Sequence, residues 1–260
     1  MGSNDQQHKL TKQQQRILKL LFKFRFVSAG LLSDTIGIHR VGVYKILEQL
    51  VLNGLVTKVY KPEFRINRKP AYYYLNKQGP TAVRKLMDVK ESVVHALYKN
   101  NEVSEDFIEH SLKLVQCYVS IKANLPPESE IFSKTEINRI KAFPKNRPDL
   151  YIRTPEGREA IIVIADGSPP YIVRKRLDEI ITHSEDADWE GEQYPVICFI
   201  LKDSSTKYSF LYTTHKKLEG IGMDEGELPI LAGSIRDFQK SNPKPWSTPY
   251  KPKDYVRLFS

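Results

Sequence analysis

Residues 32–56, LSDTIGIHRVGVYKILEQLVLNGLV, decide the fold of the first third of the chain. Apolar residues stand just before and after Gly37, and further apolar residues recur at helical spacing beyond it. A helix-turn-helix needs such a small turn residue between two short helices whose apolar faces cross. We therefore predict a helix that Ser28 caps and Gly37 ends, followed by a second helix over about 39–53.

Segments on both sides of this stretch predict the remaining parts of a winged helix. The amphipathic pattern over 11–24, with Thr11 as its N-cap, indicates a helix that precedes the pair. Residues 55–60 and 71–75 are rich in β-branched and aromatic residues and indicate two strands joined by a basic loop, with a further helix over 81–87. The loop is the wing, a hairpin tip that reaches DNA phosphates while the preceding helix enters the major groove.

The ordered segments LTKQQQRILKLLFKFRFVS, LSDTIGIHRVGVYKILEQLVLNGLV and PAYYYLNKQG resemble the winged-helix DNA-binding domain over residues 10–87. The resemblance implies that the start of the third helix reads bases and that nearby polar and cationic side chains hold phosphates. The candidate base readers are His39, Arg40, Gly42, Tyr44 and Lys45. The candidate phosphate partners are Lys12, Gln49, Lys58, Arg65, Arg68 and Lys69.

Charge is divided unevenly along this chain of 260 residues, whose formal net charge is +9. Residues 1–90 hold 17 Lys and Arg against 5 Asp and Glu, whereas residues 91–260 hold 23 against 26. Such asymmetry is typical of a module that faces a polyanion, most often nucleic acid, joined to a module with another role. The alternatives are a solvated basic surface and a winged helix used only for protein contacts.

Composition excludes several other classes of protein. The longest apolar stretch, 160–165, is far shorter than the roughly 20 residues of a spanning helix, and no leader sequence is recognisable. We therefore expect no membrane partner and a cytoplasmic location. Cys117 and Cys198 stand in no metal-binding spacing, which indicates two buried, reduced thiols. Walker, GxGxxG, HExxH and GxSxG motifs are absent, and no cofactor is predicted.

The segments that flank the winged helix are predicted from local pattern. Residues 1–9 are expected to be disordered. Residues 88–125 favour helices with a break near 99–101, and helices at this position often form a dimer interface. A homodimer on a two-fold-related DNA site is therefore expected.

Residues 126–260 predict an α/β domain with a Pro-rich tail. The expected strands and helix, in chain order, are strands over 130–133, 150–153 and 159–165, a helix over 171–182, and strands over 194–201 and 208–213. Residues 203–205 and 184–192 are expected to be loops. The tail over 242–253 interleaves prolines with Trp246 and Tyr250, and it either folds back onto this domain or serves as an extended ligand for a partner.

Two acids in this domain stand where strands begin and end. Asp149 opens one strand and Asp166 closes the next. In metal-dependent nucleases, paired acids at adjacent strand ends hold Mg²⁺, and a lysine stands two residues beyond the second acid. RPDLYIRTPEGREAIIVIADGS resembles the restriction-endonuclease-like PD-(D/E)xK fold. The motif is incomplete, because Ser168 takes the lysine position in one register and Ile164 takes the acid position in the other. Lys175 is the candidate substitute.

Taken together, the winged helix, the segment FIEHSLKLVQCYVSI and RPDLYI resemble the replication-relaxation family of plasmids and other mobile elements. The resemblance implies a regulator or accessory factor of replication, mobilisation or transcription that binds double-stranded DNA and contacts replication or transfer proteins of the same element. The alternative is a nuclease that the winged helix targets, with Asp149 and Asp166 as metal ligands, Lys175 as the third catalytic group and Mg²⁺ as cofactor.

Overall fold

The structure, a computed structural model, describes residues 10–88, 91–137, 143–186, 189, 191, 193–224, 226–239 and 244–259. The disorder expected of residues 1–9 lies outside these described residues. The chain divides into two units, residues 1–115 and residues 116–260. In the described part of the chain, no helix combines the length and the apolar character needed to cross a membrane.

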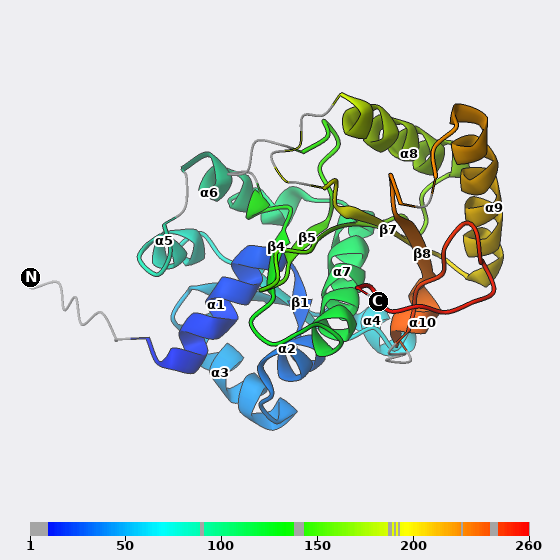
Figure 1. The fold of residues 1–260 in the computed structure, drawn as a ribbon. Helices are drawn as coiled ribbons and strands as arrows, with labels where there is room; N and C mark the ends of the chain where they lie inside the picture. Colours follow the sequence, from blue (N-terminus) through cyan, green and yellow to red (C-terminus); the bar gives the residue numbers. More distant parts are fainter. Residues whose placement is uncertain are drawn as a thin grey trace, which may run out of the picture. The chain divides into compact units, whose positions relative to one another are not determined.

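The first unit begins with three helices in the order that the sequence predicts (Figure 1). They are α1 (Lys12–Phe24), α2 (Ala29–Ile36) and α3 (Arg40–Leu52). The side chains of Thr11 and Gln14 form a capping box at the start of α1, and the Ser28 hydroxyl accepts a backbone N–H to cap α2. The predicted caps of both helices are therefore confirmed.

Glycine makes the turn between α2 and α3. Gly37 has a φ of 71°, in the left-handed region where a residue with a Cβ is disfavoured by about 1–2 kcal/mol. Beyond the turn, Val43, Leu47 and Leu50 bury one face of α3 completely. The predicted helix-turn-helix is confirmed.

An antiparallel sheet of three strands completes the winged helix. Its strands are β1 (Val27–Ser28), β2 (Val56–Val59) and β3 (Tyr72–Leu75), in the order β1-β3-β2. Tyr73 of the central strand lies opposite Val27 on one side and Lys58 on the other. β1 was not predicted, because two residues are too short to show the alternation of a strand.

The wing between β2 and β3 differs from the expected loop. Pro62–Ile66 form a short helix, α4. Pro62 stands at a first-turn position, where a missing N–H needs no partner and the fixed φ suits a helix. The loop prediction was therefore wrong over these five residues.

Further helices follow the wing. They are α5 (Gly79–Arg84), α6 (Glu91–Leu97), the 3₁₀ turn η1 (Asn100–Glu102) and α7 (Glu105–Ala123). The break predicted near 99–101 is the turn η1, and the Ser104 hydroxyl accepts the Phe107 N–H at 3.3 Å where α7 begins. α5 starts at Gly79, where a Cβ would lie 2.4 Å from the Leu55 carbonyl oxygen, so this close approach requires glycine. The boundary between the two units falls inside α7.

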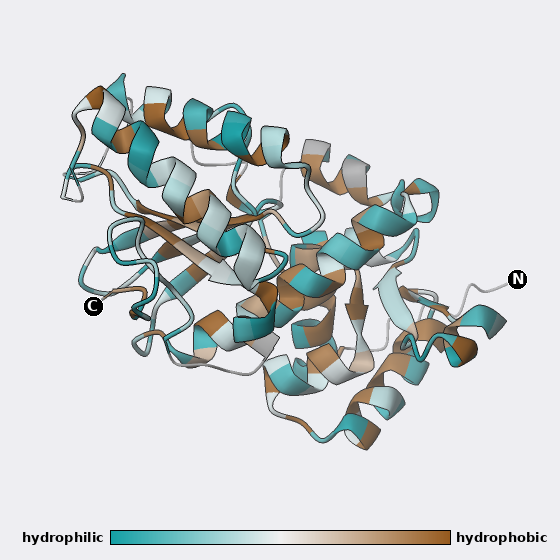
Figure 2. Cartoon of the chain, turned by 90° about the vertical axis from the view of Figure 1, so that its right-hand side faces the viewer, coloured by the Kyte–Doolittle hydropathy of each residue, from teal (hydrophilic) through white to brown (hydrophobic). Residues whose placement is uncertain are grey.

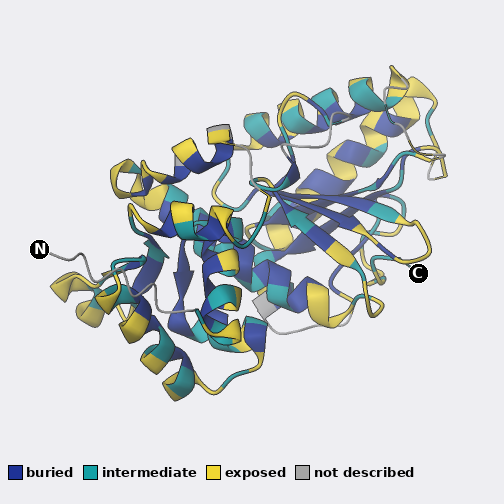
Figure 3. Cartoon of the chain, turned by 90° about the vertical axis from the view of Figure 1, so that its left-hand side faces the viewer, coloured by how far each residue is buried: buried dark blue, intermediate teal, exposed yellow. Residues whose placement is uncertain are grey.

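The second unit is built on one mixed sheet of five strands in chain order. The strands are β4 (Glu130–Ser133), β5 (Leu150–Arg153), β6 (Glu159–Ile164), β7 (Val196–Leu201) and β8 (Ile230–Ser234). β4, β5 and β6 pair antiparallel, whereas β6, β7 and β8 pair parallel. The strands of both units are largely buried (Figure 3).

Two long helices connect the parallel strands, α8 (Pro170–Glu185) after β6 and α9 (Ser204–Ile221) after β7. Both crossovers run in the same direction along the sheet, so right-handed connections place both helices on one face. An ion pair of 2.8 Å between Lys217 of α9 and Asp178 of α8 joins them. Figure 2 shows the hydrophobic strands behind helices whose residues alternate between hydrophobic and hydrophilic. A short helix, α10 (Ile235–Gln239), follows β8.

Three predictions in this region were wrong. Residues 208–213, expected to be a strand, lie inside α9. Residues 203–205, expected to be a loop, are the start of this helix, where the Asp203 carboxylate accepts the Thr206 N–H at 2.8 Å. Burial follows helical spacing, since Phe210, Leu211 and Leu218 of α9 are buried. The strand that does follow, β8, was not predicted. α8 also extends to Glu185, into the loop expected from residue 184.

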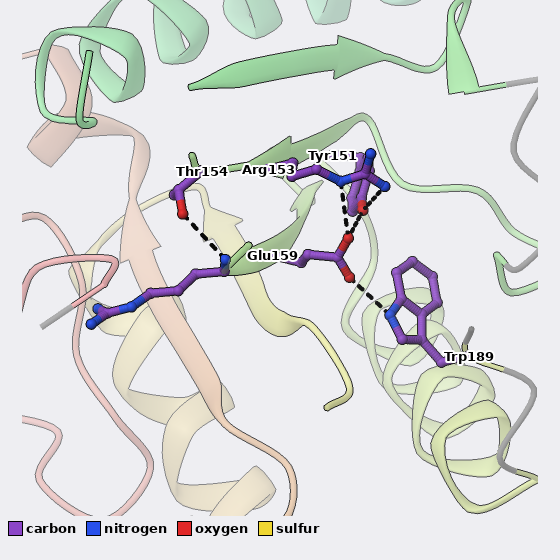
Figure 4. A network of polar contacts seen from close by, with 6 residues as sticks. Tyr151, Arg153, Thr154, Glu159 and Trp189 are labelled. Atoms are coloured by element: carbon purple, nitrogen blue, oxygen red, sulfur yellow. Dashed lines mark hydrogen bonds and ion pairs between the residues drawn. The ribbon is translucent and has the colours of Figure 1, made fainter. Parts of the chain in front are cut away.

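Polar contacts at the start of β6 attach Trp189 to the sheet (Figure 4). The Glu159 carboxylate accepts hydrogen bonds from the Tyr151 hydroxyl, from Arg153 Nε at 3.2 Å and from Trp189 Nε1 at 2.9 Å. Burial and the contact with Glu159 raise the pKa of Tyr151. Because Tyr151 is fully buried, this network holds Trp189 against the core of the second unit.

The tail folds back onto the second unit over the described residues 244–259. Trp246 is 2% exposed, and its ring lies 4.9 Å from that of Phe238. Ser247 pairs with Ala232 of β8. Of the two roles expected for the tail, packing on its own domain is therefore the one observed. Cys117 and Cys198 are both buried, as expected.

Candidate nucleic-acid interface

The amino-terminal half of α3 presents several of the predicted base readers at the surface. Arg40 and Lys45 are exposed, and Tyr44 is half-buried. The Arg40 guanidinium lies 5.7 Å from the centre of the Tyr44 ring, a cation–π contact that orients it along the helix. Because the opposite face of α3 is buried, these side chains are held on a fixed element.

The other predicted residues of α3 have structural contacts as well. His39 is the exposed N-cap, and its Nδ1 accepts the Val41 N–H at 3.4 Å. A Cβ on Gly42 would lie 3.1 Å from Ile38 Cγ2, so the small residue allows the turn and the helix to approach each other. Gln49 is exposed, yet its side-chain oxygen accepts a hydrogen bond of 3.2 Å from Gln14 of α1. Gln49 is therefore engaged in joining two helices.

The predicted phosphate partners lie around α3 on three elements. Lys12 is the first residue of α1, Lys58 lies on β2, and Arg65 lies on α4 of the wing. Arg68 follows α4 in a left-handed conformation, with a φ of 52°. All four side chains are exposed to solvent.

Acids of α7 hold the remaining cations of the wing. Lys69 Nζ lies 2.5 Å from Glu109, and Lys61 Nζ lies 2.8 Å from Glu105. Hydrogen bonding to these acids raises the pKa of both lysines, and Lys61 lowers the pKa of Glu105. All four wing cations are exposed, and the structure divides them into Arg65 and Arg68, which form no ion pair with a described residue, and Lys61 and Lys69, which pair with acids of α7.

Sequence reasoning missed two exposed residues on the same face of α3. Val41 is 55% exposed at the start of the helix, and the Glu48 carboxyl group is exposed one turn beyond Lys45. A valine side chain suits a thymine methyl group, and a carboxylate suits the amino group of cytosine. The signal for both was present, because positions 41, 45 and 48 share one helical face.

The two acids of the predicted metal site lie where β5 begins and just beyond the end of β6. Asp149 is buried, its Oδ2 accepts the Ile164 N–H at 2.7 Å, and Arg176 Nη1 lies 3.9 Å from the same oxygen. Asp166 is half-buried after β6, and Lys175 is exposed on α8. The described residues hold no cluster of three or more His, Cys, Asp or Glu side chains that suits a metal ion. A backbone N–H and an arginine therefore both engage Oδ2 of Asp149, contacts that compete with a metal ion for this oxygen.

Comparisons with known proteins find solved structures of low similarity. No protein-family model matches the chain, and no curated protein matches it. A cysteine-to-serine mutant of ZitR from Lactococcus lactis in complex with DNA is 16% identical, with a TM-score of 0.28 over 42% of this chain and 73% of that chain. The adhesin competence repressor AdcR from Streptococcus pyogenes is 17% identical, with a TM-score of 0.28 over 46% of this chain and 82% of that chain. Structural similarity at these identities and TM-scores assigns no function to this chain.

Proposed function

We propose that this chain is a sequence-specific double-stranded DNA-binding protein whose winged helix binds the duplex. The observation that carries the proposal is the exposed start of α3, where Arg40 and Lys45 stand beyond a glycine turn in the second helix of a helix-turn-helix. In this motif the second helix enters the major groove. The exposed cations of the wing, Arg65 and Arg68, then contact the backbone. The positive excess of residues 1–90 supports a polyanionic partner.

The test begins by selecting a binding site from random duplex DNA with the full chain. Affinity for the selected duplex is then compared with affinity for random duplex over a salt series. Arg40→Ala combined with Lys45→Ala is expected to weaken specific binding about a hundredfold and to remove most of the preference, because each good base contact contributes about 1–3 kcal/mol. Unchanged affinity in this variant would show that another surface binds the duplex.

Lys77→Ala is the matched control for charge. Lys77 is exposed just beyond the end of β3 and next to Gln78. The Gln78 side chain lies near Gly54, which follows the carboxyl end of α3. The control therefore removes a cation from the opposite end of the helix, and its affinity is expected to stay within twofold of the wild type.

We also propose that the protein is a homodimeric regulator or accessory factor of a mobile element, acting in replication, mobilisation or transcription. The segments that resemble the replication-relaxation family support this setting. A selected site with two-fold symmetry, found in the DNA of the element, and a dimer in analytical ultracentrifugation are the expected results. A monomer that binds an asymmetric site would contradict the proposal.

A metal-dependent nuclease is the second candidate function, and the topology of the second unit favours it. Three antiparallel strands followed by a crossover helix and a parallel strand are the order expected of a PD-(D/E)xK fold. The contacts of Asp149 oppose it. Incubation of supercoiled DNA with the protein and Mg²⁺ or Mn²⁺ is expected to give no cleavage, whereas cleavage that Asp166→Asn abolishes would establish the nuclease.

A further inference from the structure

We propose that the outward face of α8 and α9 is a second nucleic-acid surface, which binds single-stranded DNA. This α8–α9 face consists of Tyr171, Arg174, Lys175, Tyr208, Tyr212 and Lys216. It belongs to the second unit and takes a different form of DNA from the winged helix. The two proposals therefore stand or fall on different variants and different oligonucleotides.

Three tyrosine rings on this face are exposed. Tyr171 is 63% exposed, Tyr212 is 60% exposed and Tyr208 is 38% exposed. A tyrosine ring presents a large apolar area, and three of them on two neighbouring helices make a patch with an aromatic character. Unpaired bases stack on such rings, whereas the bases of a duplex are already stacked on each other. The rings therefore favour a single strand as the occupant.

Cations lie beside the rings at helical spacing. Arg174 and Lys175 follow Tyr171 by one turn, and both are exposed without an ion pair to any residue that the structure describes. On α9, Lys216 follows Tyr212 by one turn, and its Nζ lies 4.7 Å from the centre of that ring. A phosphate of a strand whose bases cover the rings is then within reach of a cation on either helix.

The order of charge along α8 is not the one that stabilises a helix. Negative side chains are favourable in the first turn and positive ones in the last, because of the helix dipole. α8 has no acid in its first turn, carries Arg174 and Lys175 in its amino-terminal half, and ends at Glu185. The helix dipole therefore does not explain these two cations, whereas an anionic partner does.

The two helices present one continuous face. Asp178, one turn beyond Arg174 and Lys175, pairs with Lys217 of α9 at 2.8 Å. This pair places α8 and α9 side by side and neutralises Asp178. The face consequently offers three exposed cations, Arg174, Lys175 and Lys216, and Lys217 beside it is ion-paired to Asp178.

The experiment measures fluorescence anisotropy of a labelled 20-nucleotide oligothymidine with the full chain. Tyr171→Ala combined with Tyr212→Ala is expected to weaken binding at least tenfold, because each stacked base contributes an appreciable share of the affinity. Arg174→Ala combined with Lys175→Ala is expected to lower the salt slope by about 1.4, the value for two phosphates of a single strand. Both variants should bind the selected duplex with the wild-type affinity.

Tyr98→Ala, which removes a 40% exposed tyrosine from the first unit, is the matched control and should leave oligothymidine binding unchanged. Thermal melts of each variant check that the fold is intact, which is expected because all substituted side chains are exposed. Absence of oligothymidine binding by the wild type would overturn the proposal. Wild-type affinity in both double variants would overturn it as well, and so would tighter binding of oligouridine RNA than of oligothymidine.

Discussion

The salt dependence of duplex binding can be predicted from the ion pairs of the winged helix. Six exposed cations around α3 and the wing form no ion pair with a residue that the structure describes: Lys12, Arg40, Lys45, Lys58, Arg65 and Arg68. Lys69, in contrast, is held by Glu109 at 2.5 Å. Each phosphate contact contributes a slope of about −0.9 to log K against log salt. Arg40 and Lys45 are assigned to bases, so the four phosphate partners Lys12, Lys58, Arg65 and Arg68 give one winged helix a slope of about −3.6, and affinity falls about 150-fold between 50 and 200 mM salt.

Three single substitutions on the wing and α7 separate exposed cations from paired ones. Arg68→Ala is expected to reduce the magnitude of the slope by about 0.9, because one phosphate contact is lost. Lys69→Ala should reduce it by clearly less, since Glu109 competes with DNA for this ammonium group. Glu109→Gln should increase the magnitude by up to about 0.9, because Lys69 is released to bind a phosphate.

The assay is fluorescence anisotropy of the selected duplex in potassium chloride from 50 to 200 mM. The reasoning is refuted if Lys69→Ala reduces the slope as much as Arg68→Ala does while Glu109→Gln leaves it unchanged. That result would mean that the ion pair seen on the wing does not persist when DNA binds.

Three further predictions concern stability. Gly37→Ala should lower the free energy of unfolding by about 1 kcal/mol because Gly37 has a φ of 71°. Gly220→Ala should raise it by about 0.5–1 kcal/mol, because Gly220 lies inside α9 with open space around it. Urea denaturation measures both changes, and equal effects would contradict the argument. Asp203→Ala should cost about 1 kcal/mol by removing the N-cap of α9, and Asp203→Asn should retain most of that stability in the same assay. Lys61 lowers the pKa of Glu105 below its ordinary value of 4.5, so this pair stabilises the fold above about pH 4.5 and the contribution is lost as pH falls through the lowered pKa. The difference in melting temperature between Glu105→Gln and the wild type should therefore disappear in acid, and a difference that persists at low pH would show that charge is not its cause.

The first unit could be predicted because its signals are local. Thr11 and Ser28 are caps whose bonds are made within three residues, and Gly37 ends a helix by its own φ. The apolar spacing of α3 shows which face is buried. These features depend on neighbours in the chain, so a sequence is sufficient to recognise them.

The α9 region shows where local pattern misleads. Residues 208–213 read YSFLYT, which is rich in strand-forming residues, yet burial of Phe210, Leu211 and Leu218 against the sheet selects a helix. Two signals for the helix were present, the cap at Asp203 and the left-handed Gly222 at its end. Packing of the helix on the sheet outweighs a strand propensity that is small for each residue.

The residues of the candidate interface could be predicted from the sequence, but the ion pairs that some of them form could not. The sequence by itself determined a helix-turn-helix with a basic wing and a set of cations around its third helix, because turn geometry, capping and helical periodicity act over a few residues. Only the tertiary structure decided which of these exposed cations are ion-paired. Lys69 and Glu109 are forty positions apart in the chain and meet when the wing lies against α7. It also decided that Asp149 contacts a backbone N–H and an arginine, and that Lys217 of α9 pairs with Asp178 of α8. A charge acquires its partner through folding, because Coulomb energy depends on distance in space rather than on separation along the chain.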